Sequence, residues 1–143
     1  HRDLHSFPTR RSSDLGSVGF GQLTKMVNQI CIAGVLQGLA EGIHFAQSAN
    51  LDVEKVVEVI SQGAAQSWQM ENRALTMNQD KFDFGFAVDW MRKDLGMALE
   101  TGRSLGAKLT LTALVDQFYA DIQSEGGGRF DTSSLLRRLN KPS

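Results

Sequence analysis

The stretch from Gly16 to Asn50 constrains the fold of this 143-residue chain more than any other. It opens with regularly spaced glycines and continues as a helical apolar pattern of about 28 residues that no proline interrupts. A helix of that length measures ~42 Å at 1.5 Å per residue, against a mean of roughly three turns. Because apolar residues occur on most of its sides, a buried helix is indicated. We therefore expect one long central helix with the rest of the chain packed around it.

Lys25 stands out at the start of this stretch. Between Gln22 and Asn50 only Lys25 and Glu41 carry full charge, so Lys25 is expected to be a largely buried cation. Loss of water and the positive end of the helix dipole both disfavour its charged form. Asn28 and Gln29 follow three and four residues later and share its helix face. The spacing leaves two interpretations open: a general acid or base beside two amides, or a lysine that extends to solvent.

A family resemblance favours the first interpretation. The segment GSVGFGQLTKMVNQ resembles the motif that opens the C-terminal domain of the β-hydroxyacid dehydrogenases, which include 3-hydroxyisobutyrate dehydrogenase and tartronate semialdehyde reductase. The family motif is Gly-x-x-Gly-x-Gly-x-x-x-Lys-x-x-Asn-Asn, and this chain matches it at Gly16, Gly19, Gly21, Lys25 and Asn28. Gln29 stands where a second asparagine is usual. The resemblance covers residues 16 to about 139.

The resemblance implies a role for each matching residue. Lys25 would be the catalytic acid/base, and Asn28 and Gln29 would hold the substrate. Gly21 would let the backbone approach the substrate closely, since glycine has no side chain.

A second motif follows in the predicted fourth helix, from Phe86 to about Leu105. Its Lys93-Asp94-Leu95 segment resembles the Lys-Asp-Leu segment of the same family. The resemblance implies that Lys93 reaches the nicotinamide cofactor, that Phe86 lines the same cleft, and that Asp94 organises the site. The residues alone also fit a solvated charged face beside an apolar core stripe.

The remaining pattern predicts further helices and no strand. The expected segments are 53–62 with Asp52 as N-cap, 68–77 capped by Ser67, 111–124 capped by Thr110, and 132–139 capped by Asp131. Trp68 and Leu75 are expected to face the core. The predicted fold is all-α: a bundle of about six helices around the long first helix, similar to the C-terminal domain of 6-phosphogluconate dehydrogenase.

Gly34, Gly38 and Gly42 recur every four residues in the long helix and form one stripe. Each glycine costs ~1 kcal/mol relative to alanine in a helix interior, so a closely approaching second helix is indicated. The pattern leaves open whether that helix belongs to the same domain or to a dimer partner. Asn28, Gln29 and other polar residues argue against a membrane-spanning helix.

Composition excludes several classes of protein. The formal net charge is −1 at pH 7, so neither nucleic acid nor an anionic membrane is expected as a partner. The single cysteine, Cys31, is expected to be buried, and no Cys/His cluster with metal-ligand spacing occurs, so no metal site is predicted. We expect a cytoplasmic protein.

Residues 1–15 differ from the rest in composition. They lack the apolar core of a signal peptide, and a transit peptide is disfavoured by Asp3 and Asp14. They resemble translated sequencing-adapter DNA, so we expect a non-native, disordered leader. Residues 16–143 are then the all-α substrate and dimerisation domain of a dehydrogenase.

No strand followed by Gly-x-Gly-x-x-Gly precedes Gly16, so the Rossmann domain of such an enzyme is expected to be absent. The resemblance implies that the complete enzyme moves a hydride between NAD or NADP and a small β-hydroxyacid or its semialdehyde. The missing N-terminal domain would bind most of the cofactor, and this chain alone would be inactive. A homo-oligomer is expected.

Two alternatives remain. One is 6-phosphogluconate dehydrogenase, but its motif is Lys-x-x-His-Asn and Asn28 occupies the histidine position. The other is a free-standing helical dimerisation module without catalysis.

Overall fold

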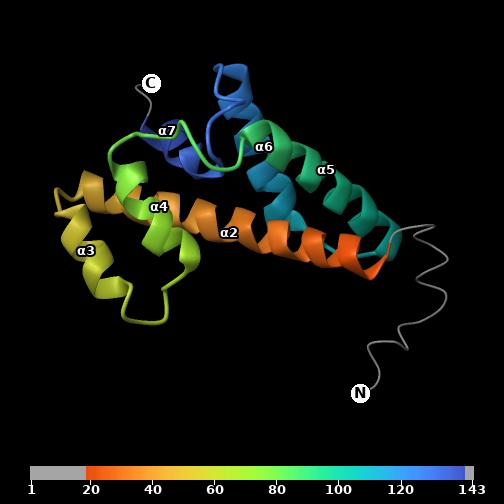
Figure 1. Cartoon of the computed structure of the whole chain (residues 1–143), viewed down its shortest axis with the longest axis horizontal. Coiled ribbons are helices and arrows are strands. Elements are labelled where there is room, and N and C mark those ends of the chain that lie inside the picture. The colour runs from red at the N-terminus through yellow and green to blue at the C-terminus, as the bar shows by residue number, and fades with distance from the viewer. Residues whose placement is uncertain (1–18, 141–143) are drawn as a thin grey trace.

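The computed structural model describes residues 19–140 and consists of six α-helices with one 3₁₀ turn. Figure 1 shows α2 running through the molecule with the other helices packed along it. The all-α prediction is confirmed. The elements are α2 (Phe20–Ser48), α3 (Val53–Ile60), α4 (Trp68–Asn78), α5 (Val88–Leu105), α6 (Thr110–Ser124), the 3₁₀ turn η2 (Thr132–Ser134) and α7 (Leu135–Asn140).

The core lies along one side of α2. This helix contacts α3, α4, α5, α6 and α7. Its buried positions include Ala33, Leu36, Ala40 and Ile43, which recur at the three- and four-residue spacing of one helix face. They pack in one cluster with apolar side chains from every other α-helix, among them Val53, Met77, Leu95, Tyr119 and Leu136.

The other side of α2 is exposed, which corrects the prediction that this helix is buried all round. Val27, Val35 and Phe45 are exposed, and so is Lys25. Cys31, which we expected to be buried, is also exposed. The reason is that the other helices cover α2 on one side, so the apolar pattern overstated how much of the helix lies in the core.

Three predicted helix caps are confirmed, at Asp52, Ser67 and Asp131. The Asp52 carboxylate accepts hydrogen bonds from the backbone N–H groups of Glu54 and Lys55, and the Ser67 hydroxyl accepts one from Met70. The fourth was wrong: Leu109 is the N-cap of α6, and Thr110 is its first helical residue. Trp68 and Leu75 of α4 are exposed, not directed into the core.

The start of α5 also differs from the prediction. The helix begins at Val88, not at Phe86, because its first backbone groups bond to a distant loop. The Val88 N–H donates to Phe130 O at 2.8 Å and the Asp89 N–H to Gly128 O at 2.9 Å. An isolated antiparallel bridge joins Ala87 to Asp131. Segments 82–88 and 127–132 therefore form one unit that positions Phe86.

Residues 1–15, predicted to be a non-native leader, lie outside the described residues. Within residues 19–140, α2 is the one helix with the length and apolar composition of a membrane span, by those two measures alone. Only 33% of its most apolar 18-residue window is buried.

Candidate functional site

A cavity of about 350 Å³ lies where α2 and α4 meet the loop before α5 and the start of η2. It brings together residues far apart in sequence, including three of those predicted from the motifs: Lys25, Gln29 and Phe86. The full lining is Lys25, Gln29, Ile32, Trp68, Gln69, Arg73, Phe86, Met91, Asp131 and Thr132. Two cations, one buried amide and two aromatic rings thus line a single cavity.

The amide of Gln29 is held in one orientation. Gln29 is buried, and its Nε2 donates to Asp94 Oδ2 at 2.9 Å. Its Oε1 accepts from Asn28 Nδ2 at 3.0 Å. Gln29 therefore links the buried Asp94 carboxylate on α5 to the exposed Asn28 amide on α2. Asn28 and Asp94 do not line the cavity themselves and are connected to it through Gln29.

The Asp131 carboxylate connects three segments of the cavity wall. It is almost wholly buried, at 1% exposed. Its Oδ1 accepts the Phe86 N–H at 2.9 Å, and its Oδ2 accepts Arg73 Nε at 3.1 Å. The Ser133 N–H and hydroxyl also donate to Oδ2. Gly85, at φ +72°, leaves the room this carboxylate needs, because a Cβ there would collide with Oδ1.

Arg73, which lines the cavity, also packs against two aromatic rings. Its guanidinium carbon lies 5.1 Å from the centroids of both the Trp68 and the Phe84 ring. Cation–π contacts at this distance are attractive. Because the charge of Arg73 is paired with that of Asp131, Lys25 is the one cation lining the cavity without an ion pair among the described residues.

Tyr119 is buried beside Asp131 and Thr132, and this burial changes the pKa of its hydroxyl. Its hydroxyl donates to Thr132 O at 3.0 Å. Burial, and secondarily the neighbouring Asp131 charge, raises the pKa of Tyr119 well above 10.0. This phenol therefore stays protonated, and keeps its hydrogen bond, at alkaline pH where an exposed tyrosine would ionise.

Two of the predicted site residues lie apart from the cavity. Gly21 is exposed in the first turn of α2. Lys93 is exposed on α5, where its Nζ lies 5.7 Å from the centroid of the Trp90 ring. Trp90 and Met97 are exposed too, so this stripe of α5 is a surface feature and not part of the core.

Arg92, next to Lys93, has a structural role. Its Nε and Nη2 donate to the two carboxylate oxygens of Asp116 at 3.0 and 3.1 Å. These hydrogen bonds raise the pKa of Arg92, an effect that burial partly offsets. The two hydrogen bonds join α5 to α6.

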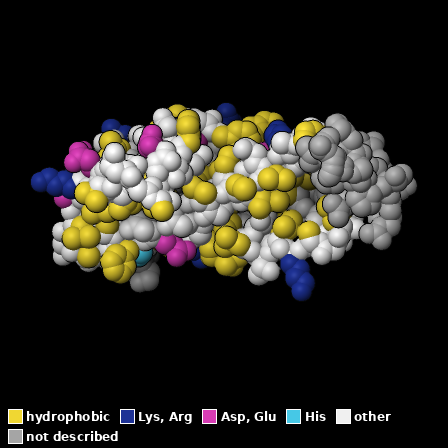
Figure 2. All heavy atoms as spheres, turned by 90° about the horizontal axis from the view of Figure 1, so that it is seen from below, with side chains coloured by type: hydrophobic (Ala, Val, Ile, Leu, Met, Phe, Trp, Pro, Cys, Tyr) yellow, Lys and Arg dark blue, Asp and Glu magenta, His cyan; other side chains and the backbone are white. Residues whose placement is uncertain are grey.

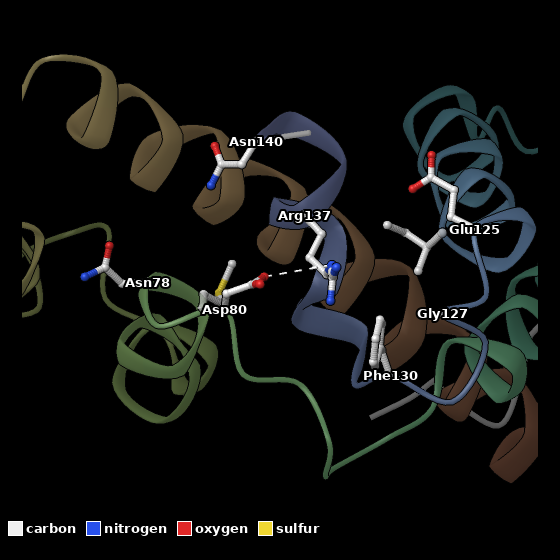
Figure 3. A pocket seen from close by; sticks show the side chains of 9 residues that line it. Asn78, Asp80, Glu125, Gly127, Phe130, Arg137 and Asn140 are labelled. Atoms are coloured by element: carbon white, nitrogen blue, oxygen red, sulfur yellow. Dashed lines mark ion pairs between the residues drawn. The ribbon is translucent and has the colours of Figure 1, made fainter. Parts of the chain in front are cut away.

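A second cavity, of about 610 Å³, lies between the end of α4, the end of α6 and α7. Figure 3 shows Arg137 directed toward Asp80, with Arg137 Nε 3.9 Å from Asp80 Oδ1. The Arg137 guanidinium also lies 5.0 Å from the Phe130 ring centroid. This cavity contains none of the residues predicted from the motifs. Among residues 19–140, no group of three or more His, Cys, Asp or Glu side chains is placed to hold a metal ion.

Sequence reasoning missed several cavity residues. Trp68 was assigned to the core, Asp131 only to a helix cap, and Gln69, Arg73 and Met91 to no role. The cap at Asp131 is present, since its carboxylate accepts the Ser133 N–H. The pairing of Asp131 with Arg73, 58 residues earlier, left no signal in the sequence.

This arrangement defines an all-helical domain in which a lysine and two linked amides lie on the central helix. Residues 19–139 match the family model described as "NAD-binding of NADP-dependent 3-hydroxyisobutyrate dehydrogenase". The chain belongs to this family of β-hydroxyacid dehydrogenases, and the resemblance noted from its motifs is confirmed.

Individual relatives support this family assignment. An uncharacterized oxidoreductase of Shewanella frigidimarina is 70% identical over 127 residues, which cover 89% of this chain and 44% of that protein. The probable 3-hydroxyisobutyrate dehydrogenase-like 1, mitochondrial, of Arabidopsis thaliana is 39% identical, over 89% of this chain and 38% of that protein.

The fold agrees as well. The structure of Mycobacterium tuberculosis 3-hydroxyisobutyrate dehydrogenase with L-serine superposes with a TM-score of 0.77 at 26% identity, over 89% of this chain and 46% of that one. The chain therefore spans less than half the length of these relatives.

Proposed function

We propose that this chain is the substrate-binding half of an NAD(P)-dependent dehydrogenase acting on a small β-hydroxyacid or its semialdehyde, with Lys25 as general acid/base. One observation supports this most: Lys25 and Gln29 of the first motif share a cavity with Phe86 of the second. The two motifs are about 60 residues apart in sequence, yet the fold joins them at one place.

Lys25 acts on the proton of the substrate oxygen. When the carbonyl is reduced, the ammonium gives its proton to that oxygen; when the alcohol is oxidised, the neutral amine takes the hydroxyl proton. Lys25 is exposed in this chain, so substrate and the rest of the enzyme provide whatever shielding from water the step needs. A positioned general acid or base contributes a factor of roughly 10²–10⁴ to the rate.

The side-chain amides of Asn28 and Gln29 orient the substrate. Asn28 is exposed one turn beyond Lys25 and can bond a substrate oxygen, while Gln29 fixes the direction of the Asn28 amide. Asp94 holds Gln29 in turn. Asp94 is thus a positioning residue, two hydrogen bonds removed from the substrate. Gly21 lies one turn before Lys25 and offers backbone without a side chain on the approach to it.

The cavity suits a flat ring beside an anionic acid. Phe86 is 39% exposed and Trp68 is 59% exposed, so both offer ring surface. The wall also holds Gln69, whose buried Oε1 accepts no hydrogen bond in the described part of the chain and would be satisfied by a donor group in the cavity. A bound NAD or NADP would supply or take up the hydride. Phe86 would pack against this cofactor, and Lys93 would bond its polar groups.

Most of the cofactor affinity is assigned to an N-terminal Rossmann domain of the same protein. This assignment rests on the length of the relatives, of which the chain covers 38–46%. Isolated, the chain should then turn over no substrate. We further expect a homo-oligomer in the cytoplasm, with neither nucleic acid nor membrane as partner.

The test is turnover by the complete coding sequence. The protein expressed from the recovered upstream DNA should interconvert NAD(P) and NAD(P)H with at least one β-hydroxyacid or semialdehyde in a panel of small acids. The 143-residue chain, assayed in parallel, should show no turnover. An upstream sequence that encodes no nucleotide-binding domain would refute the proposal and favour a non-catalytic helical module.

A further inference from the structure

Arg73 is a second cation in the cavity of about 350 Å³ that contains Lys25, and part of its hydrogen-bonding capacity is unused. A guanidinium has five N–H donors. Arg73 Nε donates to Asp131 Oδ2 at 3.1 Å, and Arg73 Nη1 donates to Asn72 O at 3.2 Å. The remaining N–H groups on Nη1 and Nη2 donate to no residue within 19–140. Because the side chain lines the cavity and is 21% exposed, a ligand in the cavity can reach it.

Packing holds the Arg73 guanidinium in place before any ligand binds. Its carbon lies 5.1 Å from the ring centroids of both Trp68 and Phe84, and the buried Asp131 carboxylate fixes Nε. Gly85 leaves space beside Nη2, since a Cβ there would stand only 3.0 Å from that atom. A planar guanidinium fixed in this way matches the two oxygens of a carboxylate. Arg73 therefore has the form of a carboxylate receptor.

The charges around this cavity differ from those elsewhere on the molecule. On the face shown in Figure 2, Lys and Arg side chains stand apart from one another among hydrophobic ones. In the cavity between α4, α6 and α7, Arg137 shares the wall with the carboxylates of Asp80 and Glu125. Among the described residues, the one carboxylate that lines the Lys25 cavity is Asp131, which is 1% exposed and already accepts hydrogen bonds from three residues. The Lys25 cavity therefore favours an anionic ligand.

The two cations enter the cavity from opposite ends. The α2 residues that line it extend from Lys25 to Ile32, a length of ~10 Å at 1.5 Å per residue. Helix α4 lies along the C-terminal half of α2 (Figure 1), where Asn78 Oδ1 accepts a hydrogen bond from Gln47 Nε2 at 2.9 Å. Arg73 belongs to α4 and therefore approaches the cavity from the Ile32 end, whereas Lys25 lies at the other end.

We propose that Arg73 binds a second acidic group of the substrate, so that the complete enzyme prefers a β-hydroxyacid whose side chain ends in a carboxylate. In any β-hydroxyacid the reacting oxygen and the acid's own carboxyl carbon are three bonds apart, a span of at most ~3.8 Å. That carboxylate stays near Lys25, so a group bound by Arg73 comes from farther along the substrate. The apolar side chains of Ile32 and Met91 line the same cavity and suit intervening methylene groups. This inference rests on the proposed function and specifies its substrate class.

The first experiment compares matched substrates of the complete enzyme. Each pair consists of a β-hydroxyacid with a straight alkyl chain on its α-carbon and the same acid with a carboxylate in place of the terminal methyl group. For at least one chain length, kcat/KM should be at least about tenfold higher for the carboxylate member, mainly through a lower KM, because a charge-assisted hydrogen bond is gained. Arg73→Met should remove this preference. Arg73→Lys should restore only part of it, since lysine keeps the charge but not the planar pair of donors.

Arg138→Met is the matched control. Arg138 also pairs with an aspartate, Asp121, at 2.8 Å, and its guanidinium carbon lies 3.9 Å from the Phe118 ring centroid, but it does not line this cavity. The control should keep the unchanged enzyme's preference. A loosened cavity wall would slow both members of a pair alike, so an Arg73→Met enzyme with the same ratio of kcat/KM values would overturn the proposal. An unchanged enzyme that shows no preference at any chain length would also overturn it.

The second experiment measures binding without turnover. The chain has two tryptophans, so in a Trp90→Phe background the fluorescence of Trp68 reports on the neighbouring Arg73. Glutarate should change this fluorescence saturably, with a Kd at least about tenfold below that of pentanoate, the monoacid of the same length, and Arg73→Met should abolish the difference. Equal Kd values for the two acids would refute the receptor even in an active enzyme. If glutarate binds through Arg73 but the complete protein turns over no β-hydroxyacid, the receptor stands and the proposed function is wrong.

Discussion

Replacing Asp131 with asparagine should destabilise the domain far more than an ordinary surface charge change. Asparagine keeps the shape of the side chain, and its remaining oxygen can still accept the Phe86 N–H. An amide NH₂ in place of Oδ2, however, would face two donors that cannot turn away, Arg73 Nε and the Ser133 N–H, and the Ser133 hydroxyl, which can rotate to accept instead. The variant therefore loses both of these bonds and gains a clash of donors.

The structure sets the size of the effect. The bond from Arg73 is charge-assisted, worth ~1.5–3 kcal/mol, and the unsatisfied Ser133 N–H costs about 1 kcal/mol or more. Because the Arg73 side chain is 21% exposed, water recovers part of the first term. We expect a loss of about 2–4 kcal/mol in the free energy of unfolding, which for a domain of this size is a fall of about 10 °C in Tm.

Urea and thermal unfolding of the 143-residue chain measure this directly. The matched control is Asp121→Asn, because Asp121 also pairs with an arginine, Arg138, at 2.8 Å, but its side chain is 55% exposed. Exposed ion pairs contribute about 0–1 kcal/mol, so this control should lose little stability. Equal losses in the two variants would refute the assignment of Asp131 as the link between the three wall segments.

Two further predictions concern pH and cofactor binding. The raised pKa of Tyr119 means that the folded state keeps a proton that the unfolded chain releases near pH 10.0, so its stabilising contribution is complete below that pH and is lost as pH rises above it. In urea titrations from about pH 9 to about pH 11, Tyr119→Phe should therefore show a shallower alkaline loss of stability, and identical slopes would contradict the buried phenol. In the complete enzyme, Lys93→Ala should raise the cofactor KM about ten- to a hundredfold, with a smaller effect on the substrate KM, since one charge-assisted hydrogen bond is lost. Arg103→Ala, exposed in the last turn of α5, is the control. Arg92, although next to Lys93, is unsuitable as a control because it holds Asp116 and its loss would disturb the fold. Equal effects of Lys93→Ala and Arg103→Ala would place Lys93 on a solvated face.

Local chemistry made most of the helices predictable. Asp52 and Ser67 cap α3 and α4 through their own neighbours, and Gly106 ends α5 with φ +71°. These signals lie within a few residues of the helix ends they determine. The start of α5 was not predictable in the same way, because Phe86 is held out of the helix by Asp131, 45 residues later.

Burial was harder to predict than helicity. The apolar pattern of α2 was recognised, but a sequence pattern does not say whether the covering surface belongs to the same chain. The predicted burial of the whole helix therefore included Val35 and Phe45, although the described residues leave them exposed. The same ambiguity placed Trp68 in the core, whereas it lies at the cavity beside Arg73.

The candidate site was only partly predictable for the same physical reason. The motifs identified Lys25, Gln29 and Phe86, which the fold brings to one cavity. They gave no indication that Gln29 connects Asn28 to Asp94, because a hydrogen bond between α2 and α5 depends on how those helices pack. Lys93 was grouped with Phe86 by helical spacing, but Phe86 precedes the helix, so that spacing does not place the two side chains on one helix face.

The turnover number of the Lys25→Ala variant tests the central claim most directly. In the complete enzyme, kcat should fall by roughly 10²–10⁴ while the unfolding midpoint stays within error of the unchanged protein, because Lys25 is exposed and holds no ion pair in the described residues. Lys25→Arg should not restore activity, since arginine stays protonated, and Lys55→Ala on the exposed face of α3 should leave kcat unchanged. A Lys25→Ala enzyme that keeps near-full kcat would show that proton transfer is carried out elsewhere and that the proposed catalytic role is wrong.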